Sequence, residues 1–421
     1  MTDQLNSLMQ AAGEAANSGR WHDAEQLWRD VQRLDPHNPK AHFSLGVHAF
    51  QRRDLAGALA HLTAARQVSP NDPQILLTLA IVQRERGDTA GEWEAINGAL
   101  AADAYFLPGL LAKAGLQERF DRPRAAAATY RNALKVAPPP PHWPPELRPQ
   151  LAHARALVDA DTAAFTDFLD ERMELARARL EPGDASRWRE AASIMSGRSQ
   201  PYHSVANQLH VPRLPAIPFL DPSLFPWVAA IETQTAAIRG EIEAVLADDG
   251  QSLSPYIAYR PGEPVNQWAE LNHSTRWGVY QLWQGGEGVQ PHLSRCPVTA
   301  KALDLVEMAQ IGGLCPNAMF SALGPHTQIP PHHGETNARL VAHLPLVVPP
   351  NCTYRVGFEE RRWEVGKVLI FDDTLEHTAR NDSDDVRIVL IFDVWNPLLT
   401  NAERNLVNVM TAAARDFHLD P

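Results

Sequence analysis

The residues best suited to chemistry lie late in the chain. Residues 330–337 read PPHHGETN, and Glu376-His377 and Arg387 follow them. Imidazole nitrogens bind Fe(II), Zn(II) or Cu(II), and two histidines with one carboxylate on one face form a common iron site. A guanidinium binds a carboxylate through two parallel hydrogen bonds. The sequence therefore predicts a metal site beside a site for an organic carboxylate.

Two sets of ligands are open from the residues alone. His332 could pair with His377, or His333 and Glu335 could join His377 as an ordinary two-histidine, one-carboxylate set. Side chains alternate between the two faces of a strand, so His332 and Gly334 share one face while His333 and Glu335 share the other. Only one of the two sets can face the metal.

Short β-rich segments must position these residues. They are separated by Gly, Pro, Asn and Asp turns and lie at residues 338–344, 353–356, 367–371 and 387–392. The last two are almost continuously hydrophobic, which predicts central strands. Such a series of short strands is typical of a jelly roll or barrel, with His332 and His377 meeting across its mouth.

This part of the chain resembles a known family, the aspartyl/asparaginyl β-hydroxylases. The resemblance rests on residues 331–340, 343–346, 363–373, 376–377 and 387–397, and covers about residues 200–405. It implies a double-stranded β-helix (a jelly-roll, cupin-like fold) over residues 201–421. It also implies an Fe(II)- and 2-oxoglutarate-dependent dioxygenase that uses O2 to hydroxylate a C–H bond, here of an Asp- or Asn-type side chain in a peptide or protein.

The resemblance assigns roles to individual residues. It makes His332 and His377 the iron ligands, and so selects His332 over His333. Gly334 then stands where related enzymes carry a carboxylate ligand, and water would fill that position. Arg387 would bind the distal carboxylate of 2-oxoglutarate, a role that suits its planar guanidinium. His343 and Ser321 match residues that help to hold 2-oxoglutarate, and Trp283 matches an aromatic near the substrate entrance.

One position departs from the family pattern. Hydroxylases of Asp or Asn side chains carry an arginine two residues after the position of Arg339, and this chain has Val341 there. Because an apolar side chain cannot pair with a carboxylate, either Arg339 or another group binds the substrate, or the substrate differs. A small molecule or a lipid group is one alternative. A non-catalytic adaptor with a relic oxygenase domain is another.

The first third of the chain is a repeat with a period of 34 residues. Pro36 and Pro70 share one phase, and the large residues Trp28, Leu62, Ile96 and Tyr130 share another. Small residues where paired helices cross, a bulky residue between them and a closing proline are typical of tetratricopeptide repeats. The pattern predicts about four repeats over residues 1–137, forming an α-solenoid with a groove that binds a peptide or protein, or that only supports the next domain.

Composition sets the remaining expectations for this multidomain α + β chain. Residues 138–200 begin with four prolines and form a stiff joint followed by a helical bridge. A net charge of −12 over 421 residues argues against nucleic-acid binding. Three scattered cysteines, no signal peptide and no apolar run of membrane-spanning length favour a cytoplasmic protein.

Overall fold

The computed structural model describes residues 2–180, 182–248 and 253–418. The chain separates into two compact units, Met1–Ser199 and Gln200–Pro421. Of the segment 138–200, which the sequence sets apart as a joint and bridge, residues 138–199 group with the repeats. We describe each unit by itself.

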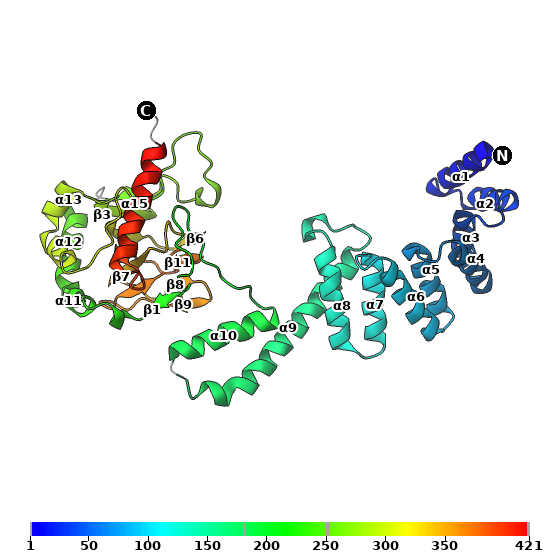
Figure 1. Cartoon of the computed structure of the whole chain (residues 1–421), viewed down its shortest axis with the longest axis horizontal. Helices are drawn as coiled ribbons and strands as arrows, with labels where there is room; N and C mark the ends of the chain where they lie inside the picture. The colour runs from blue at the N-terminus through cyan, green and yellow to red at the C-terminus, as the bar shows by residue number, and fades with distance from the viewer. Residues whose placement is uncertain (1, 181, 249–252, 419–421) are drawn as a thin grey trace. The chain divides into compact units, whose positions relative to one another are not determined.

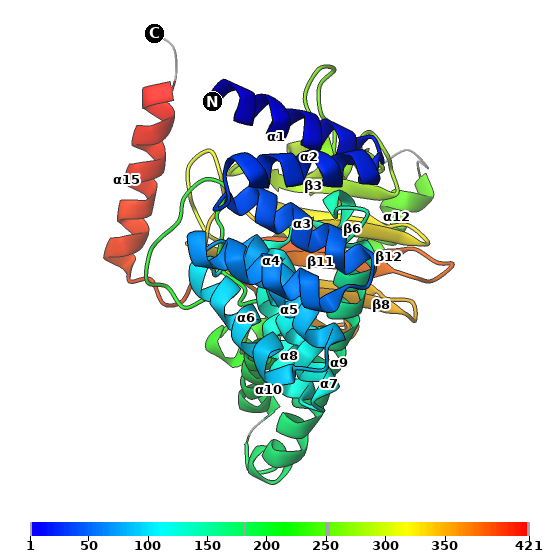
Figure 2. The ribbon, with the colours of Figure 1, turned by 90° about the vertical axis from the view of Figure 1, so that its right-hand side faces the viewer.

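The first unit is helical. Its first eight helices follow one another as four antiparallel pairs, visible in Figures 1 and 2. The elements are α1 (Thr2–Asn17), α2 (Trp21–Leu34), α3 (Pro39–Gln51), α4 (Leu55–Val68), α5 (Pro73–Glu85), α6 (Thr89–Ala102), α7 (Leu107–Arg119), α8 (Pro123–Val136), η1 (Pro140–His142), α9 (Arg148–Arg177) and α10 (Pro182–Ser196).

The 34-residue period appears directly in the helix boundaries. Asn38 and Asp72 cap the starts of α3 and α5 by accepting hydrogen bonds from backbone amides of the first turn. These caps satisfy amides that would otherwise lack a partner. The four large residues that share one phase of the repeat, Trp28, Leu62, Ile96 and Tyr130, are all buried. The solenoid of four helix pairs agrees with the repeat predicted from the sequence.

The second unit is rich in antiparallel strands, with helices before, between and after them. Its elements are β1 (Phe219–Leu220), η2 (Pro222–Leu224), α11 (Val228–Glu232), α12 (Thr235–Asp248), β2 (Ser254–Pro255), η3 (Asn266–Trp268), β3 (Trp277–Gln284), β4 (Glu287–Gly288), α13 (Gln290–Arg295), α14 (Pro297–Leu303), β5 (Ala318–Leu323), β6 (Thr327–His332), β7 (Arg339–Val347), β8 (Cys352–Val356), β9 (Glu359–Arg361), β10 (Leu369–Phe371), β11 (His377–Asn381), β12 (Arg387–Trp395) and α15 (Asn401–His418).

The strands form two sheets. The larger has the order β1-β10-β7-β12-β5-β3-β2, with β4 paired to β3, and the smaller has the order β6-β11-β8-β9. The pairings between these named strands are all antiparallel. The two segments predicted to be central strands lie inside the large sheet. Segment 387–392 belongs to β12, and segment 367–371 contains β10, which lies between β7 and the short edge strand β1.

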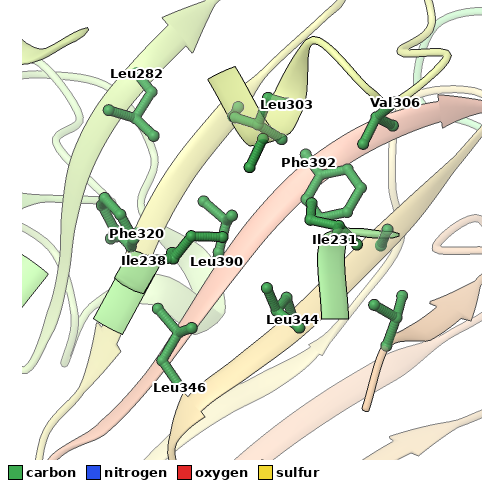
Figure 3. Close-up of a cluster of buried hydrophobic side chains, with 14 of the residues drawn as sticks. Ile231, Ile238, Leu282, Leu303, Val306, Phe320, Leu344, Leu346, Leu390 and Phe392 are labelled. Atoms are coloured by element: carbon green, nitrogen blue, oxygen red, sulfur yellow. The ribbon is translucent and has the colours of Figure 1, made fainter. Parts of the chain in front are cut away.

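Alternation along the central strands gives the large sheet two different faces. One face packs under helices, where Phe320, Leu344 and Phe392 from the strands meet Ile231 and Ile238 from α11 and α12 (Figure 3). The other face forms a second core with the small sheet, joining residues of β5, β7 and β12 to residues of β6, β8 and β11. The chemistry-bearing side chains lie on this second face, between the two sheets.

Candidate functional site

His332 and His377 lie next to each other on neighbouring strands of the small sheet. They are paired in the β6–β11 register, and their ring centroids are 3.9 Å apart. The Nδ1 atom of His332 is 2.8 Å from the Pro330 carbonyl oxygen, and that of His377 is 3.0 Å from the Leu375 carbonyl oxygen. A carbonyl can only accept, so each Nδ1 carries the proton and each Nε2 keeps a free lone pair. Two such rings could hold a metal through their Nε2 atoms.

Burial keeps both rings neutral. Desolvation, with help from the neighbouring His377, lowers the pKa of His332 to about 3. Desolvation also lowers the pKa of His377 to about 4. A metal binds only an imidazole nitrogen that carries no proton. Both rings are neutral at neutral pH, so neither has to lose a proton before it can bind a metal.

The backbone places His332, rather than His333, opposite His377. Strand β6 ends at His332, and residues 333–335 leave the strand, so strict alternation does not extend to Glu335. The Glu335 carboxylate instead lies 3.6 Å from Nη2 of Arg339. Within the described ranges, no group of three or more His, Cys, Asp or Glu side chains is arranged to hold a metal.

Gly334 is closely covered by Asp373. A Cβ atom at position 334 would overlap the Asp373 carboxylate, and the Gly334 amide donates to the Asp373 carbonyl oxygen at 2.7 Å. Asp373 is only 5% exposed, and its Oδ1 has no hydrogen-bonding partner among the described residues. The contact between Asp373 and Gly334 cannot be read from the order of residues in the chain.

Arg387 is a buried cation without a counterion among the described residues. It begins β12, is 1% exposed, and its Nε and Nη1 have no hydrogen-bonding partner in the part of the chain that the structure describes. The guanidinium carbon lies 4.6 Å from the centroid of the Trp363 ring. Burial lowers the pKa of Arg387 to about 10. The group is still charged at neutral pH, and an unpaired buried charge is costly unless a ligand compensates it.

His343 and Ser321 stand beside Arg387 on the inner face of the large sheet. Indole Nε1 of Trp363 donates to Nδ1 of His343 at 3.2 Å, and burial holds the pKa of His343 well below its ordinary value. The neutral ring therefore carries its proton on Nε2, as a donor. Indole Nε1 of Trp277 donates to the Ser321 hydroxyl at 3.1 Å. The two indoles orient these polar groups, and sequence reasoning gives neither indole that role.

All these side chains except Trp363 line one pocket of about 760 Å³ between the sheets. The pocket joins the histidine pair to Arg387, His343 and Ser321, and its wall includes Val341 and Arg339. Its aromatic lining comes from Tyr256, Tyr259, Trp268, Trp277, Tyr354 and Phe371.

Trp283, expected near the substrate entrance, lies elsewhere. It is not among the pocket-lining residues and packs instead against the core beneath the helices. The β3–β5 register shifts between Gln281 and Trp283, so that Gln281 pairs with Met319 and Trp283 with Ala318. This extra residue moves Trp283 to the opposite face of the sheet. Trp268 and Trp277 are the tryptophans beside the histidine pair, with ring centroids 5.0 and 6.4 Å from the His332 ring centroid.

Arg339 is enclosed by acidic side chains. Its nitrogens lie 2.6 Å from Asp373, 3.3 Å from Asp393 and 3.6 Å from Glu335. Three carboxylates around one guanidinium leave this wall of the pocket with a net negative charge. Val341, next to it along the pocket, is 8% exposed and apolar. These three carboxylates would compete with a substrate carboxylate for Arg339.

A second pocket lies within the helical unit. It has a volume of about 630 Å³ and is lined mostly by apolar residues of α5, α6, α7 and the start of α9, with Arg84, Arg119 and His153 among its polar members. None of the helices in the described parts of the chain is both long and apolar enough to cross a membrane.

Comparisons with known proteins find separate similarities for the helical unit and for the strand-rich unit. Residues 232–397 match the family model described as aspartyl/asparaginyl beta-hydroxylase, and residues 10–73 match a tetratricopeptide-repeat model. An ornithine lipid ester-linked acyl 2-hydroxylase of Rhizobium tropici is 37% identical over 44% of this chain and 63% of its own length. The Mus musculus aspartyl/asparaginyl beta-hydroxylase is 38% identical over 32% of this chain and 18% of its own length.

The similar solved structures include a tetratricopeptide-repeat protein of Thermus thermophilus. It is 15% identical, with a TM-score of 0.32, over 45% of this chain and 99% of that one. The chain spans less than two thirds of the length of the curated relatives named above. Residues 232–397 are thus similar to the aspartyl/asparaginyl β-hydroxylase family, and residues 10–73, earlier in the chain, are similar to tetratricopeptide repeats.

Proposed function

We propose that this protein is an Fe(II)- and 2-oxoglutarate-dependent hydroxylase. The observation that carries the proposal is Arg387, a buried guanidinium with no counterion among the described residues, in the same pocket as two histidines with free Nε2 atoms. A dicarboxylate that also reaches a metal on the histidines would satisfy both features at once. The two antiparallel sheets that enclose the pocket support a double-stranded β-helix for this domain.

The residues present fit the two absent groups. His332 and His377 would hold the iron through Nε2, and Arg387 would bind the distal carboxylate of 2-oxoglutarate. His343 would donate from Nε2, and the Ser321 hydroxyl would contribute a further hydrogen bond. Bound iron, with 2-oxoglutarate and O2, supplies hydroxylation of a C–H bond, giving the alcohol, succinate and CO2.

The protein's own part is to orient the reactants and exclude water. The backbone carbonyls of Pro330 and Leu375 fix the tautomers of the two ligands. Trp268 and Trp277 cover His332 on one side, and Tyr354 and Phe371 lie within 6.1 and 6.0 Å of the His377 ring centroid. This aromatic wall gives the site a low dielectric, which strengthens the pairing of Arg387 with a carboxylate.

The first candidate substrate is an Asp- or Asn-type side chain of a peptide. Arg339 is the residue that the sequence suggests in place of the arginine missing at Val341, but three carboxylates already surround it. An aspartate side chain would therefore be repelled, whereas the neutral amide of asparagine would not. We propose that the peptide, if a peptide is the substrate, is brought to the enzyme by the tetratricopeptide repeats, a fold suited to protein interaction.

An acyl group of a lipid is the second candidate. The apolar Val341 in the pocket wall favours it, as does the similarity to a protein named as an ornithine lipid acyl hydroxylase. The relic-domain adaptor is disfavoured, because a pocket that has lost its ligands has no reason to retain a costly unpaired arginine.

The proposal is tested by succinate release in the presence of Fe(II) and 2-oxoglutarate. We expect His332→Ala and His377→Ala to abolish it, and His333→Ala, the matched neighbour, to retain it. Mass spectrometry of asparagine peptides, aspartate peptides and an amine-bearing lipid after the reaction would show which of them gains one oxygen. Turnover that survives His332→Ala but not His333→Ala would refute the ligand assignment.

A further inference from the structure

An extended segment at residues 202–211 crosses the site from outside the family-matched region. This strap precedes residue 232, where the family match begins, and follows the end of the helical unit at Ser199. It runs along two loops, each adjacent to one of the metal-ligand histidines. The 333–337 loop follows His332, and the 372–376 loop precedes His377.

On the His332 side, the strap pairs with the loop through its backbone. The amide of Asn207 donates to the Gly334 carbonyl at 3.0 Å, and the amides of Gln208 and Leu209 donate to the Glu335 carbonyl at 2.9 and 3.2 Å. The Asn207 side chain adds a hydrogen bond from Nδ2 to the His333 carbonyl at 2.8 Å. The strap thus holds each of the three residues that follow His332.

The end of the strap is fixed by a buried asparagine. The Val211 amide donates to Oδ1 of Asn337 at 2.8 Å, and Nδ2 of Asn337 donates to the Val211 carbonyl at 2.9 Å. Asn337 is 1% exposed. This closed pair of hydrogen bonds holds the strap in register with the 333–337 loop.

On the His377 side, the strap reaches Thr374. The Val205 amide donates to the Thr374 carbonyl at 2.8 Å, and the hydroxyls of Ser204 and Thr374 are 2.6 Å apart. Thr374 is fully buried and its amide donates to the Asp372 carboxylate at 3.0 Å. One short segment therefore contacts the chain on both sides of the histidine pair.

This arrangement matters because the two ligands sit at strand ends. His332 is the last residue of β6 and His377 the first of β11, so the ring positions depend on how the adjoining loops run. The loops are also joined directly, by the Gly334 amide donating to the Asp373 carbonyl. Metal sites lose affinity when the groups that support their ligands are loosened.

We propose that the 202–211 strap is a positioning element that clamps the 333–337 and 372–376 loops and so sets the separation of His332 and His377 for metal binding. The inference rests on the proposed function, because it takes the two histidines as metal ligands. It extends the competent site beyond residues 232–397, the part of the chain that matches the family model. The strap also adds Asn207 to the pocket wall.

The test compares two substitutions at one position in the full chain. Gln208→Pro removes the amide that donates to Glu335, whereas Gln208→Ala keeps it and loses only a side chain that reaches Glu335 at 3.5 Å. Co(II) is the probe, because its absorption spectrum reports the ligands. We expect Gln208→Pro to weaken Co(II) binding by about tenfold or more, the usual effect of losing support for a metal ligand. Gln208→Ala should bind like wild type.

Ser204→Ala and Asn207→Ala provide independent variants at the two loops, each expected to weaken Co(II) binding. Thermal unfolding is measured in parallel: a merely structural strap would lower the melting temperature but leave the Co(II) affinity of the folded protein unchanged. That outcome for Gln208→Pro would overturn the role of the strap. Failure of wild type to bind Co(II), or binding that survives His332→Ala and His377→Ala, would overturn the proposed function and the strap with it.

Discussion

The carboxylate of Asp373 fills the space into which any side chain on Gly334 would extend. The second residue after His332 therefore has a carboxylate next to it, supplied by the loop that precedes His377. Asp373 is held there by its ion pair with Arg339 at 2.6 Å. The site combines two histidines with a nearby acid that comes from a different part of the chain.

Restoring a carboxylate at position 334 should therefore fail to build a three-ligand site. We expect Gly334→Asp to displace Asp373 and break its buried pair with Arg339, at a cost of about 3–5 kcal/mol in the free energy of unfolding. Gly334→Ala should also destabilise, because the overlap begins at Cβ. Urea denaturation and Co(II) titration measure the two effects. Tighter Co(II) binding by a Gly334→Asp protein of normal stability would contradict this account.

Replacing Arg387 should make the unliganded protein more stable and weaken its binding of 2-oxoglutarate. Without a counterion among the described residues, the buried guanidinium is a cost to the fold, which the Trp363 ring only partly offsets. We expect Arg387→Met to unfold at a higher temperature than wild type in the absence of 2-oxoglutarate. Added 2-oxoglutarate should stabilise wild type at concentrations that leave the variant unstabilised, because the guanidinium that pairs with its carboxylate is gone.

Arg387→Lys is the matched control for that experiment. It keeps the charge but loses the planar pair of donors, so 2-oxoglutarate should still stabilise it, at higher concentration. The kinetic effect of Arg387→Met follows from the hydrogen bonds that it loses. A loss of about 1.5–3 kcal/mol for hydrogen bonds to a charged group corresponds to a KM for 2-oxoglutarate raised by about 10- to 150-fold in this variant. An unchanged KM would show that the pocket binds the cosubstrate elsewhere.

The sequence is informative where the signal is local. The 34-residue period locates the helix pairs, because each repeat buries the same large residue against its neighbour. His332, His377 and Arg387 lie in or beside short hydrophobic segments, which predicts that strands position all three. The structure places the three side chains in one pocket, because their strands belong to the two sheets that enclose it. Arg387 stands out from the chain order alone, because burying an unpaired guanidinium at the start of a hydrophobic strand is costly.

The parts that could not be predicted depend on long-range pairing. The strap residue Asn207 bonds to a carbonyl 126 residues away, and Ser204 meets Thr374 across 170 residues. Trp283 does not line the pocket because one extra residue in β3 reverses which face it occupies, and no pattern in the β3 sequence marks that shift. The engagement of Arg339 by three acids likewise joins residues from β7, β12 and two loops.

Val341 gives a prediction about substrate choice. Val341→Arg would place a second cation beside the acidic wall formed by Glu335, Asp373 and Asp393. We expect it to raise turnover of aspartate peptides relative to asparagine peptides, and to lower turnover of an acyl substrate. Val341→Met, of similar polarity to valine but longer, controls for the loss of space. Competition between the two peptides, followed by mass spectrometry, measures the ratio, and an identical ratio in wild type and Val341→Arg would show that this wall does not contact the reacting side chain.

Glu335 gives a prediction about pH. Burial raises its pKa above the ordinary value, and the neighbouring Asp393 and Asp373 add to the effect, against the opposing attraction of Arg339. A carboxyl whose pKa is raised in the folded state favours folding at low pH, and this contribution is lost as the pH rises through the folded-state pKa. At neutral pH, ionised Glu335 is therefore less favourable in the folded protein than a neutral side chain would be.

Glu335→Gln should consequently be more stable than wild type at neutral pH. The advantage should shrink as the pH falls towards about 4, near the ordinary pKa of glutamate, because wild-type Glu335 then gains its proton. Free energies of unfolding from urea denaturation at several pH values measure the difference. A variant that is less stable than wild type at neutral pH would mean that the 3.6 Å attraction to Arg339 outweighs the combined effect of burial and the two aspartates. In that case the charge of Glu335 would stabilise the folded protein, in addition to making the pocket wall acidic.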